Sequence, residues 1–504
     1  MIFPLEDPEL RELCRVVEIS GNVNNIMIGG AWVAPDASET FEVVSPRSEE
    51  VLARIPAANE VDVDRAVAAA REAFDHGPWP RLTLEERIGH VARLADILER
   101  RREELAALST EELGSPILFS QGYQAMQPAV SSRYFIEAAR RFDYEEVRES
   151  EFGTSLVVHE PIGVVAAIVP FNIPLVLAIQ KTVPALLSGC TVIIKPSPDA
   201  PLGCYGLAEA FIEAGFPEGV VSMLATTAQA GAHLVAHGGV DKVSFTGSTE
   251  IGSRIGEACG AAIKPVTLEL GGKSAAIITE DADIDQAVAG ILGVSIAANN
   301  GQGCTCQTRI LVPRSRYEEV KGAFVDAVAA LPIGDPFDPS NVVTPLSSER
   351  QRDRVEEYVA LGLEEGATLA YGGKRPAGHD TGYYFEPTIF SDVTNDMRIA
   401  REEIFGPVVA LLPYDTIDEA IDIANDSEFG LSGTVWTGDE KEGMRIARLI
   451  RTGTFCINTY AFDINAPFGG FKRSGIGREN GIEAIASFTV SKAITFPPGA
   501  KLPA

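Results

Sequence analysis

From Gly163 onward, the sequence alternates short apolar runs rich in β-branched residues with stretches of helical spacing. The apolar runs occupy residues 164–169, 191–194, 220–224 and 243–245. Strands that alternate with helices in this way form parallel sheets with helices on both faces. A second series of the same kind runs from near Ser274 to Val435. The sequence therefore predicts an α/β fold with two doubly wound α/β domains and a ligand site at the carboxyl ends of the strands.

Chain length and charge narrow the class of protein. A chain of 504 residues exceeds the usual size of one hydrophobic core, so two or three domains are expected. The net charge of −29, from 42 basic and 71 acidic side chains, repels the phosphates of nucleic acids and of anionic lipids. We therefore expect neither a nucleic acid nor a membrane as a partner. The longest apolar runs are also too short to span a bilayer.

The cysteines and the N-terminus point to a compartment. Seven cysteines are an odd and sparse set for this length, which is typical of a reducing environment. Residues 1–8 contain early acidic residues and lack the basic-then-apolar order of a signal or transit peptide. The sequence predicts a cytoplasmic protein and leaves the role of the first twenty-odd residues open.

Short strands are expected outside the two alternating series. Residues 26–32 and 41–44 alternate around glycine turns, which predicts that they pair as a small antiparallel unit at a domain edge. Residues 142–159 break the helical pattern and predict a strand pair rich in charge.

Cys304 lies between small residues in the segment 300–309. A substrate carbon can approach a thiol closely in such surroundings, so the thiol can act as a nucleophile. Burial preference alone favours a small apolar core residue instead. Cys306 raises another alternative, a redox or metal pair, but C-x-C lacks the usual C-x-x-C geometry and the chain has no second cysteine pair.

Two polar residues near the ends of expected strands can assist a nucleophile. Glu269 ends the strand 265–268, and Gly271, which follows closely, lets the backbone bring a cofactor or water near. The Glu269 carboxylate can act as a general base, although a carboxylate at a strand end is usually solvated or ion-paired. The Asn172 amide and the Cys304 backbone N–H can donate to an oxygen that becomes negative after thiolate attack. The alternative is that Asn172 sets up a turn before Pro174.

The strand-to-helix junction at 245–252 is a candidate phosphate site. Gly247 and Ser248 lie where free backbone N–H groups and the helix dipole favour a pyrophosphate. Lys195, followed by Ser197, ends an apolar strand where a doubly wound sheet places ligand contacts, and its ammonium suits ribose hydroxyls or phosphate. The alternatives are a purely structural glycine turn and a solvated lysine.

His233 and His237 lie four residues apart on an expected helix, a spacing compatible with a metal. Neither a glutamate directly after His233 nor a third ligand near in sequence accompanies them. We therefore expect a surface or core pair and no metal site.

The segments 268–273 and 300–309 together closely resemble the base and nucleophile segments of the NAD(P)-dependent aldehyde dehydrogenase superfamily. The resemblance extends from about residue 26 to about residue 494. It implies that Cys304, which follows the G-Q-x pattern, is the nucleophile and that Glu269 is the general base for the hydrolytic water. Asn172 lies in a segment that matches the family's P-[WF]-N-x-P pattern. The implied reaction passes through a thiohemiacetal and a thioester to a carboxylic acid, with hydride transfer to the nicotinamide.

The resemblance also assigns further site residues. Lys181 and Glu479 match positions that the family uses in proton relay, Glu403 is assigned to the nicotinamide ribose and Phe405 to packing beside the nicotinamide ring. The expected cofactor is NAD. Many members have a glutamate three residues after the lysine of the cofactor strand, where this chain has Pro198, so we also predict at least partial tolerance of NADP.

The positions that match the family's substrate tunnel are mixed in character. Ile173 and Leu177 are aliphatic, whereas Tyr460, Phe462 and Phe468 are aromatic. We expect a medium-sized apolar pocket for an aliphatic, terpenoid or aromatic aldehyde. Two other classes stay open, a CoA-acylating aldehyde or semialdehyde dehydrogenase and a non-catalytic cofactor-binding relative. The presence of Glu269 argues against the first, and the presence of the whole set of reactive residues argues against the second.

The resemblance implies a division of the chain. Residues 1–141 and 160–269 form a Rossmann-like cofactor-binding domain, and residues 270–470 form a catalytic domain. Residues 142–159 and 486–504 form a small β element for oligomerisation, as a hairpin and an accompanying tail. A homodimer or a homotetramer is expected.

Overall fold

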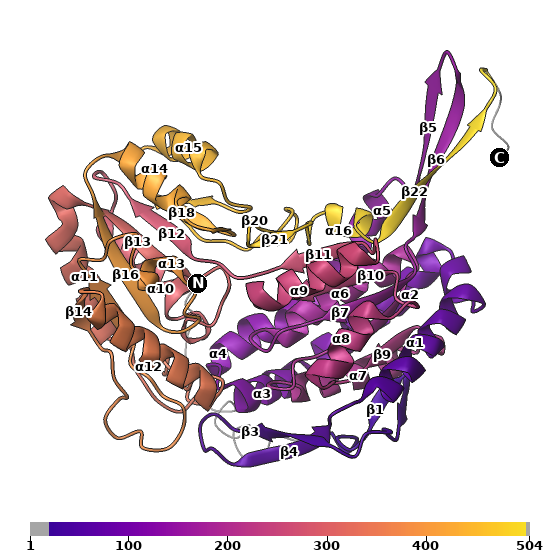
Figure 1. Ribbon diagram of the computed structural model, residues 1–504, viewed down its shortest axis with the longest axis horizontal. Helices are drawn as coiled ribbons and strands as arrows, with labels where there is room; N and C mark the ends of the chain where they lie inside the picture. Colours follow the sequence, from indigo (N-terminus) through magenta and orange to yellow (C-terminus); the bar gives the residue numbers. More distant parts are fainter. Residues whose placement is uncertain (1–19, 500–504) are drawn as a thin grey trace.

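The computed structural model describes residues 20–499 and contains two large sheets (Figure 1). Expectations about the first nineteen residues, Cys14 included, and about the last five lie outside the described residues. One sheet has eight strands in the order β2-β1-β9-β8-β7-β10-β11-β21, and the other has seven in the order β14-β15-β16-β13-β12-β18-β19. The predicted α/β fold with two doubly wound sheets is confirmed.

The eight-stranded sheet is parallel from β9 to β11 and antiparallel at both edges. Its strands are β1 (Ile26–Ile28), β2 (Ala31–Val33), β7 (Val164–Ile168), β8 (Thr191–Lys195), β9 (Val221–Met223), β10 (Lys242–Thr246), β11 (Val266–Glu269) and β21 (Gly475–Ile476). The helices of this half are α1 (Glu60–Asp75), α2 (Leu84–Arg100), α3 (Arg102–Leu113), α5 (Met126–Arg141), α6 (Pro174–Ser188), α7 (Leu202–Ala214), α8 (Ala228–Ala236), α9 (Thr249–Ala261) and α16 (Glu483–Ala486).

The seven-stranded sheet is parallel except for its edge strand β14. Its strands are β12 (Ser274–Ile278), β13 (Gln307–Pro313), β14 (Thr368–Tyr371), β15 (Thr388–Ser391), β16 (Val408–Tyr414), β18 (Gly433–Trp436) and β19 (Cys456–Ile457). The helices of this half are α10 (Ile284–Ser295), α11 (Tyr317–Ala329), α12 (Glu349–Glu364), α13 (Arg398–Arg401), α14 (Ile417–Asn425) and α15 (Glu440–Leu449).

Each large sheet has a hydrophobic core on both faces, because side chains alternate along a strand. In β7, Val165 and Ala167 belong to a core that includes residues of α2, α5, α6 and α7, whereas Val164 and Ala166 belong to a second core with residues of α1. In β12, Ala275 and Ala276 divide in the same way between two cores. Burial on both faces explains why these strands read as continuous apolar runs in the sequence.

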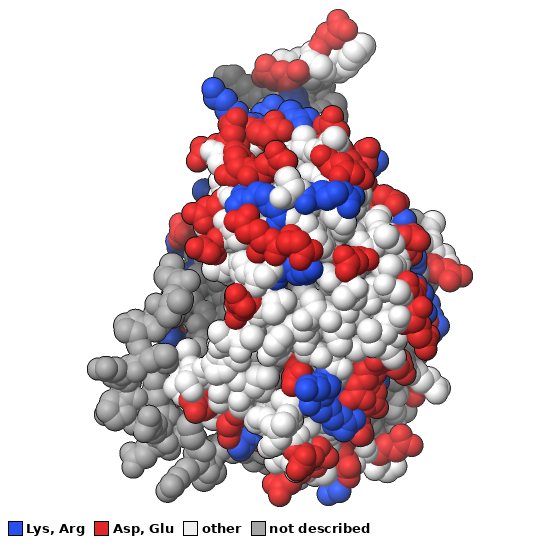
Figure 2. Space-filling model, turned by 90° about the vertical axis from the view of Figure 1, so that its left-hand side faces the viewer, with Lys and Arg blue, Asp and Glu red and all other residues white. Residues whose placement is uncertain are grey.

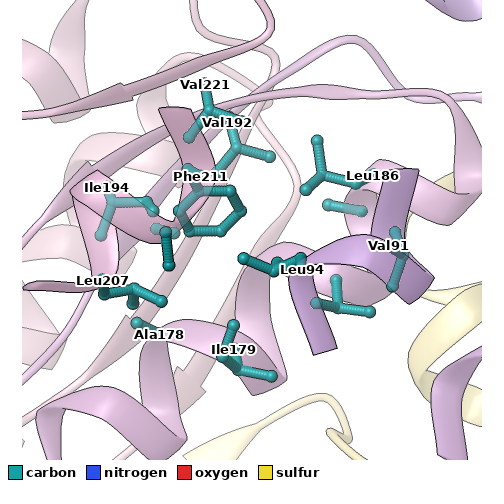
Figure 3. Packing of buried hydrophobic residues seen from close by; sticks show 14 of the residues in the cluster. Val91, Leu94, Ala178, Ile179, Leu186, Val192, Ile194, Leu207, Phe211 and Val221 are labelled. Atoms are coloured by element: carbon teal, nitrogen blue, oxygen red, sulfur yellow. The ribbon is translucent and has the colours of Figure 1, made fainter. Parts of the chain in front are cut away.

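Helix α6 is buried along its whole length. It begins with Pro174 at its first position and ends at Gly189, whose φ of +96° closes the helix in the left-handed region. Figure 3 shows Ala178, Ile179 and Leu186 of this helix among side chains of β8, β9, α2 and α7. A helix with helices and a sheet around it must be apolar on most sides, so its polar residues stand out.

The N-terminal strands do not pair as predicted. β1 pairs with β2 and β9, whereas β3 (Thr40–Val44) pairs with β4 (Val51–Pro56). The loop between β1 and β2 is Gly29-Gly30, with φ of +62° and +86°. Two consecutive left-handed residues make the two-residue turn that matches the twist of a hairpin, so β1 turns back onto its immediate neighbour in sequence.

A small sheet projects from the body of the molecule (Figure 1). It has the order β22-β6-β5, with β5 (Glu145–Ser150), β6 (Gly153–Pro161) and β22 (Thr489–Phe496), all antiparallel. The expected strand pair at 142–159 is therefore present and extends to Pro161. The shortest sheet pairs β17 (Phe429–Gly430) with β20 (Phe471–Lys472).

The described residues show how charge is distributed on one face of the molecule and how apolar its helices are. Figure 2 shows the end of the molecule around α11 and α14, where basic side chains lie among acidic ones and form no separate patch. Arg314 before α11 pairs with Asp415 before α14. Within residues 20–499, no helix combines the length and apolar character that crossing a membrane requires.

Candidate active site

One cavity of about 700 Å³ collects the reactive residues that the sequence singled out. Cys304, Glu269 and Asn172 all line it. Glu269 comes from the end of β11 in the eight-stranded sheet, whereas Cys304 lies just before β13 of the seven-stranded sheet. The site therefore lies where the two sheets meet, at the carboxyl ends of β7, β10 and β11.

The Cys304 loop packs closely on the glycines that follow β11. A side chain at Gly272 would put its Cβ 2.3 Å from the Cys304 carbonyl oxygen, so only glycine allows this approach. Burial raises the pKa of the Cys304 thiol, and the carboxylates of Glu403 and Glu269 contribute in the same direction. The thiol is therefore protonated at neutral pH in this state and needs a base to become a nucleophile.

Asn172 is held against the same loop. Its side-chain Nδ2 donates to the Gln302 backbone carbonyl at 3.0 Å, and the Asn172 backbone carbonyl accepts from Asn299 Nδ2 at 3.2 Å. The amide has two N–H groups, so one stays available for a ligand. In the described chain, the Cys304 backbone N–H has no acceptor in another residue. Both donors that the sequence predicted for an oxyanion are thus present at the cavity.

Glu269 is 3% exposed, and both oxygens of its carboxylate lack a hydrogen-bond partner. Burial raises the pKa of Glu269 well above its ordinary value, and the negative charge of Glu479 raises it further. The positive charges of Lys181 and Arg478 oppose this rise without cancelling it. A carboxylate with a raised pKa is a stronger base than an exposed one, which suits a general base.

Lys181 and Glu479 form a buried ion pair beside Glu269. Lys181 Nζ lies 2.5 Å from Glu479 Oε1 and donates to Ser244 Oγ at 3.3 Å, and Ser244 donates to the same Glu479 oxygen at 3.1 Å. Lys181 is fully buried in α6, whereas Glu479 lines the cavity. This arrangement connects the cavity to a buried ammonium through one carboxylate.

Most of the expected cofactor residues surround the same cavity. Gly247, Ser248, Gly271, Glu403 and Phe405 all line it. Ser248 caps α9, its side chain accepting from the third N–H of that helix at 3.3 Å. Glu403 Oε1 accepts the Gly272 N–H at 3.0 Å, and burial raises the pKa of Glu403 to about 7.

Lys195 and Ser197 are separated from that set. They end β8 and follow it, two strands from β10, and neither belongs to the cavity lining. Lys195 Nζ donates to the Pro196 carbonyl at 3.3 Å, and burial lowers the pKa of Lys195 to about 8. Its stem packs on α8, with Cε 3.1 Å from the position that a Cβ would take on Gly231.

The expected substrate residues line the same cavity as Cys304. Ile173, Leu177, Tyr460, Phe462 and Phe468 are all there. The rings of Phe462 and Phe468 lie 5.3 Å apart between centroids. The walls are mostly apolar, as the sequence predicted.

The chain is similar to known proteins over nearly its whole length. The model of the aldehyde dehydrogenase family matches residues 32–494. The chain belongs to the aldehyde dehydrogenase family. The geranial dehydrogenase of Castellaniella defragrans is 46% identical over 471 residues, which are 93% of this chain and 98% of that protein.

Solved structures of the family share the fold. The structure of a Mycobacterium tuberculosis aldehyde dehydrogenase complexed with NAD+ has a TM-score of 0.93 at 47% identity and covers 95% of this chain and 99% of its own. The structure of a Pseudomonas syringae aldehyde dehydrogenase C mutant complexed with NAD+ and octanal has a TM-score of 0.93 at 37% identity. The match covers 97% of this chain and 100% of that one. The resemblance inferred from the motifs is confirmed.

Sequence reasoning missed several wall residues of this aldehyde dehydrogenase, among them Phe119, Tyr123 and Val294. Phe119 ends α4 (Ile117–Phe119), and Tyr123 lies in the π-helical turn Ser120–Gln124. Their rings are 5.5 Å apart, and Tyr123 also faces Phe462 at 6.5 Å. Aromatic residues four apart were the available signal, but that spacing occurs in any amphipathic helix and does not indicate a pocket.

The two histidines have a third neighbour that the sequence did not reveal. Asp64 Oδ1 of α1 lies 2.6 Å from His233 Nε2 and 3.3 Å from His237 Nε2. His237 Nδ1 accepts the Gly239 N–H, so in the neutral ring the proton is on Nε2, which points at Asp64. A metal would need that nitrogen's lone pair. The geometry therefore favours a hydrogen-bonded pair, and the lack of a metal remains a prediction.

Proposed function

We propose that the protein oxidises an aldehyde to a carboxylic acid, with NAD+ as hydride acceptor and with covalent intermediates on Cys304. The observation that carries this proposal is the meeting of Cys304, Asn172 and Glu269 on one cavity. These residues supply a nucleophile, an oxyanion donor and a base in the same place. Relatives solved with NAD+ support the choice of cofactor.

The residues around α9 and β11 fit a dinucleotide. A Cβ on Gly271 would lie 2.5 Å from Glu403 Oε2, so the glycine keeps a narrow passage open beside that carboxylate. Gly247 and Ser248 would hold the pyrophosphate at the N-terminus of α9, and Lys195 and Ser197 would contact the adenosine ribose. Glu403 would bind the nicotinamide ribose, and Phe405 would pack beside the ring.

In the first half of the reaction, the Cys304 thiol gives its proton to water in the cavity, and its sulfur bonds to the aldehyde carbon. The oxygen that becomes negative is held by the free N–H of the Asn172 amide and by the Cys304 backbone N–H. When bound, the nicotinamide accepts the hydride that the collapsing thiohemiacetal releases. An acyl thioester on Cys304 remains.

In the second half, Glu269 takes a proton from the water that attacks the thioester, and the acid leaves as Cys304 regains a proton. The raised pKa of Glu269 suits this task, because burial makes its carboxylate a stronger base than an exposed one. Glu479 and Lys181 would pass that proton onward from the cavity, since their buried pair lies beside Glu269.

We infer a medium-sized apolar aldehyde as substrate. The aliphatic wall of Ile173 and Leu177 faces a cavity whose other residues include Phe462 and Phe468, and such apolar walls suit an apolar substrate. A similar protein is a geranial dehydrogenase and another was solved with octanal, an unsaturated terpenoid and a saturated aliphatic aldehyde.

The experiment that tests this function measures NADH and NADPH formation across aliphatic, terpenoid and aromatic aldehydes, with succinic semialdehyde for comparison. Cys304→Ala is the control and should form neither product. If turnover required CoA, the acyl acceptor would be CoA and not water. A far higher rate with succinic semialdehyde than with hexanal or benzaldehyde would contradict the apolar pocket.

We also propose that the chain divides functionally as the family resemblance implies, with the β5-β6-β22 sheet as an assembly element. Val147, Phe152, Val490 and Ile494 of this sheet expose large apolar side chains, and Phe152 is 85% exposed. Apolar residues on a projecting sheet favour contact with another subunit. Light scattering should show a homodimer or homotetramer. The double variant Phe152→Asp with Val147→Asp should shift the measured mass toward that of the monomer. An unchanged mass would mean that the subunit interface lies elsewhere.

A further inference from the structure

Gln180 brings a neutral polar group to the otherwise mostly apolar substrate side of the cavity. It lies in α6, lines the cavity and is only 3% exposed. Within residues 20–499, neither the oxygen nor the nitrogen of its side-chain amide has a hydrogen-bond partner. A buried amide without partners is unfavourable, so this group needs a ligand or a water molecule to bond to.

The register of α6 gives the Gln180 side chain no other direction. Ala178 and Ile179 point into the hydrophobic core (Figure 3). Lys181 reaches Glu479 and Ser244. Leu177, three residues before Gln180, lines the cavity, and residues three apart share a helix face. Gln180 therefore continues the wall that Ile173 and Leu177 begin.

The position of Gln180 along this wall is remote from the start of the helix. Gln180 lies seven positions after Ile173, which is about 10 Å along the helix axis at 1.5 Å per residue. Asn172, the proposed oxyanion donor, directly precedes Ile173. A substrate whose aldehyde oxygen lies at Asn172 and whose body follows the α6 wall would present its far part to Gln180.

We propose that Gln180 selects aldehydes that carry a hydroxyl group remote from the aldehyde carbon on an otherwise apolar body. The amide can donate to and accept from a hydroxyl, which an alkyl group of the same size cannot match. This inference rests on the proposed aldehyde oxidation and sharpens its substrate class.

The test compares kcat/KM within pairs of aldehydes that have equal numbers of heavy atoms. The pairs are 8-hydroxyoctanal with nonanal, and 4-(hydroxymethyl)benzaldehyde with 4-ethylbenzaldehyde. In Gln180→Met, which keeps the length of the side chain and removes the amide, the hydroxyl-to-alkyl ratio should fall by about 2- to 10-fold, the range of one neutral hydrogen bond. Gln286→Met makes the same change at an exposed position on α10 and should keep the wild-type ratio.

Two results would overturn the proposal. An unchanged ratio with wild-type kcat/KM values in Gln180→Met would mean that water satisfies the amide whichever substrate is bound. An unchanged ratio with equal losses of kcat/KM for both members of each pair would mean that Gln180 only packs. Gln180→Leu provides a second variant, and thermal unfolding of each variant identifies a folding defect. Failure of the proposed function looks different, since no aldehyde would then produce NADH with the wild-type protein.

Discussion

Replacing Glu269 by glutamine tests the proposed base with little structural disturbance. The two side chains have nearly the same shape, and neither carboxylate oxygen of Glu269 has a hydrogen-bond partner to lose. Glu269 is 3% exposed, so the change also removes a buried carboxylate from beside Glu479. Any effect on turnover then reports the chemistry of the carboxylate itself.

The stability of this variant follows from the direction in which folding moves the pKa. The folded-state pKa of Glu269 is raised, so the stabilisation from its proton is fully present below the unfolded-state pKa and is lost as pH rises through the folded-state value. A tenfold difference in proton affinity between the folded and unfolded states corresponds to about 1.4 kcal/mol. Glu269→Gln lacks this loss, so its free energy of unfolding should equal or exceed that of the wild type at pH 8, with the advantage shrinking toward pH 4.

The kinetic effect should appear after acylation. A general base contributes about 10²- to 10⁴-fold to a proton-transfer step, so thioester hydrolysis should slow by that factor. Stopped-flow fluorescence with excess aldehyde and NAD+ should still show a burst of NADH that approaches one equivalent per active site. The steady-state rate that follows should be strongly reduced.

Glu357→Gln serves as the matched control, because Glu357 is exposed on α12. It should leave both phases unchanged. A steady-state rate for Glu269→Gln within a factor of two of the wild type would refute the role of Glu269 in hydrolysis. Equal slowing of the burst and the steady state would instead mean that the Glu269 carboxylate deprotonates Cys304.

Other perturbations test other parts of the site. Asn172→Ala should lower kcat/KM by about 10²- to 10³-fold through loss of one oxyanion donor, and a loss below tenfold in steady-state assays would contradict that role. Lys181→Met leaves the Glu479 charge buried and unpaired and should destabilise the fold by about 3–5 kcal/mol in urea unfolding, whereas a wild-type midpoint would mean that the pair is not formed. With Pro198 in place of a carboxylate, NADP should support turnover alongside NAD, and Pro198→Glu should weaken NADP alone; complete rejection of NADP by the wild type would disprove this. Because the pKa of the Cys304 thiol is raised, kcat/KM should increase as pH rises above neutral, and a profile that is flat from pH 6 upward would contradict this direction.

Local patterns, read with the family resemblance, were enough to predict the residues that line the reactive part of the cavity. Cys304 and Glu269 lie in short segments with glycines, and a Cβ at Gly272 would come within 2.3 Å of the Cys304 carbonyl oxygen. The glycines leave a readable motif in each segment, although the contact that they permit joins two separate segments. The alternation of apolar runs with helices likewise predicted both sheets.

Long-range placement was harder to predict. The N-terminal strand pairing was wrong because the Gly29-Gly30 turn, rather than the apolar pattern, chose the partner of β1. Asp64 reaches His233 across 169 residues, and no feature near either residue indicates that contact. Lys195 and Ser197, which their position at a strand end joined to the cofactor set, lie outside the lining of the main cavity.

The sequence by itself determined the fold class, because hydrophobic periodicity is a local property of the chain, and the resemblance of short glycine-containing segments to the family led to Cys304 and Glu269 as the proposed thiol and base. Only the tertiary structure decided what the reactive residues face. Lys181 and Glu479 meet across 298 residues, and Tyr123 joins Phe462 at the substrate wall. Gln180 looked like one more residue of a buried helix until the packing of its neighbours left its amide facing the cavity. Which side of a buried helix meets a core and which meets a cavity depends on the elements around it, and that information is spread over the whole chain.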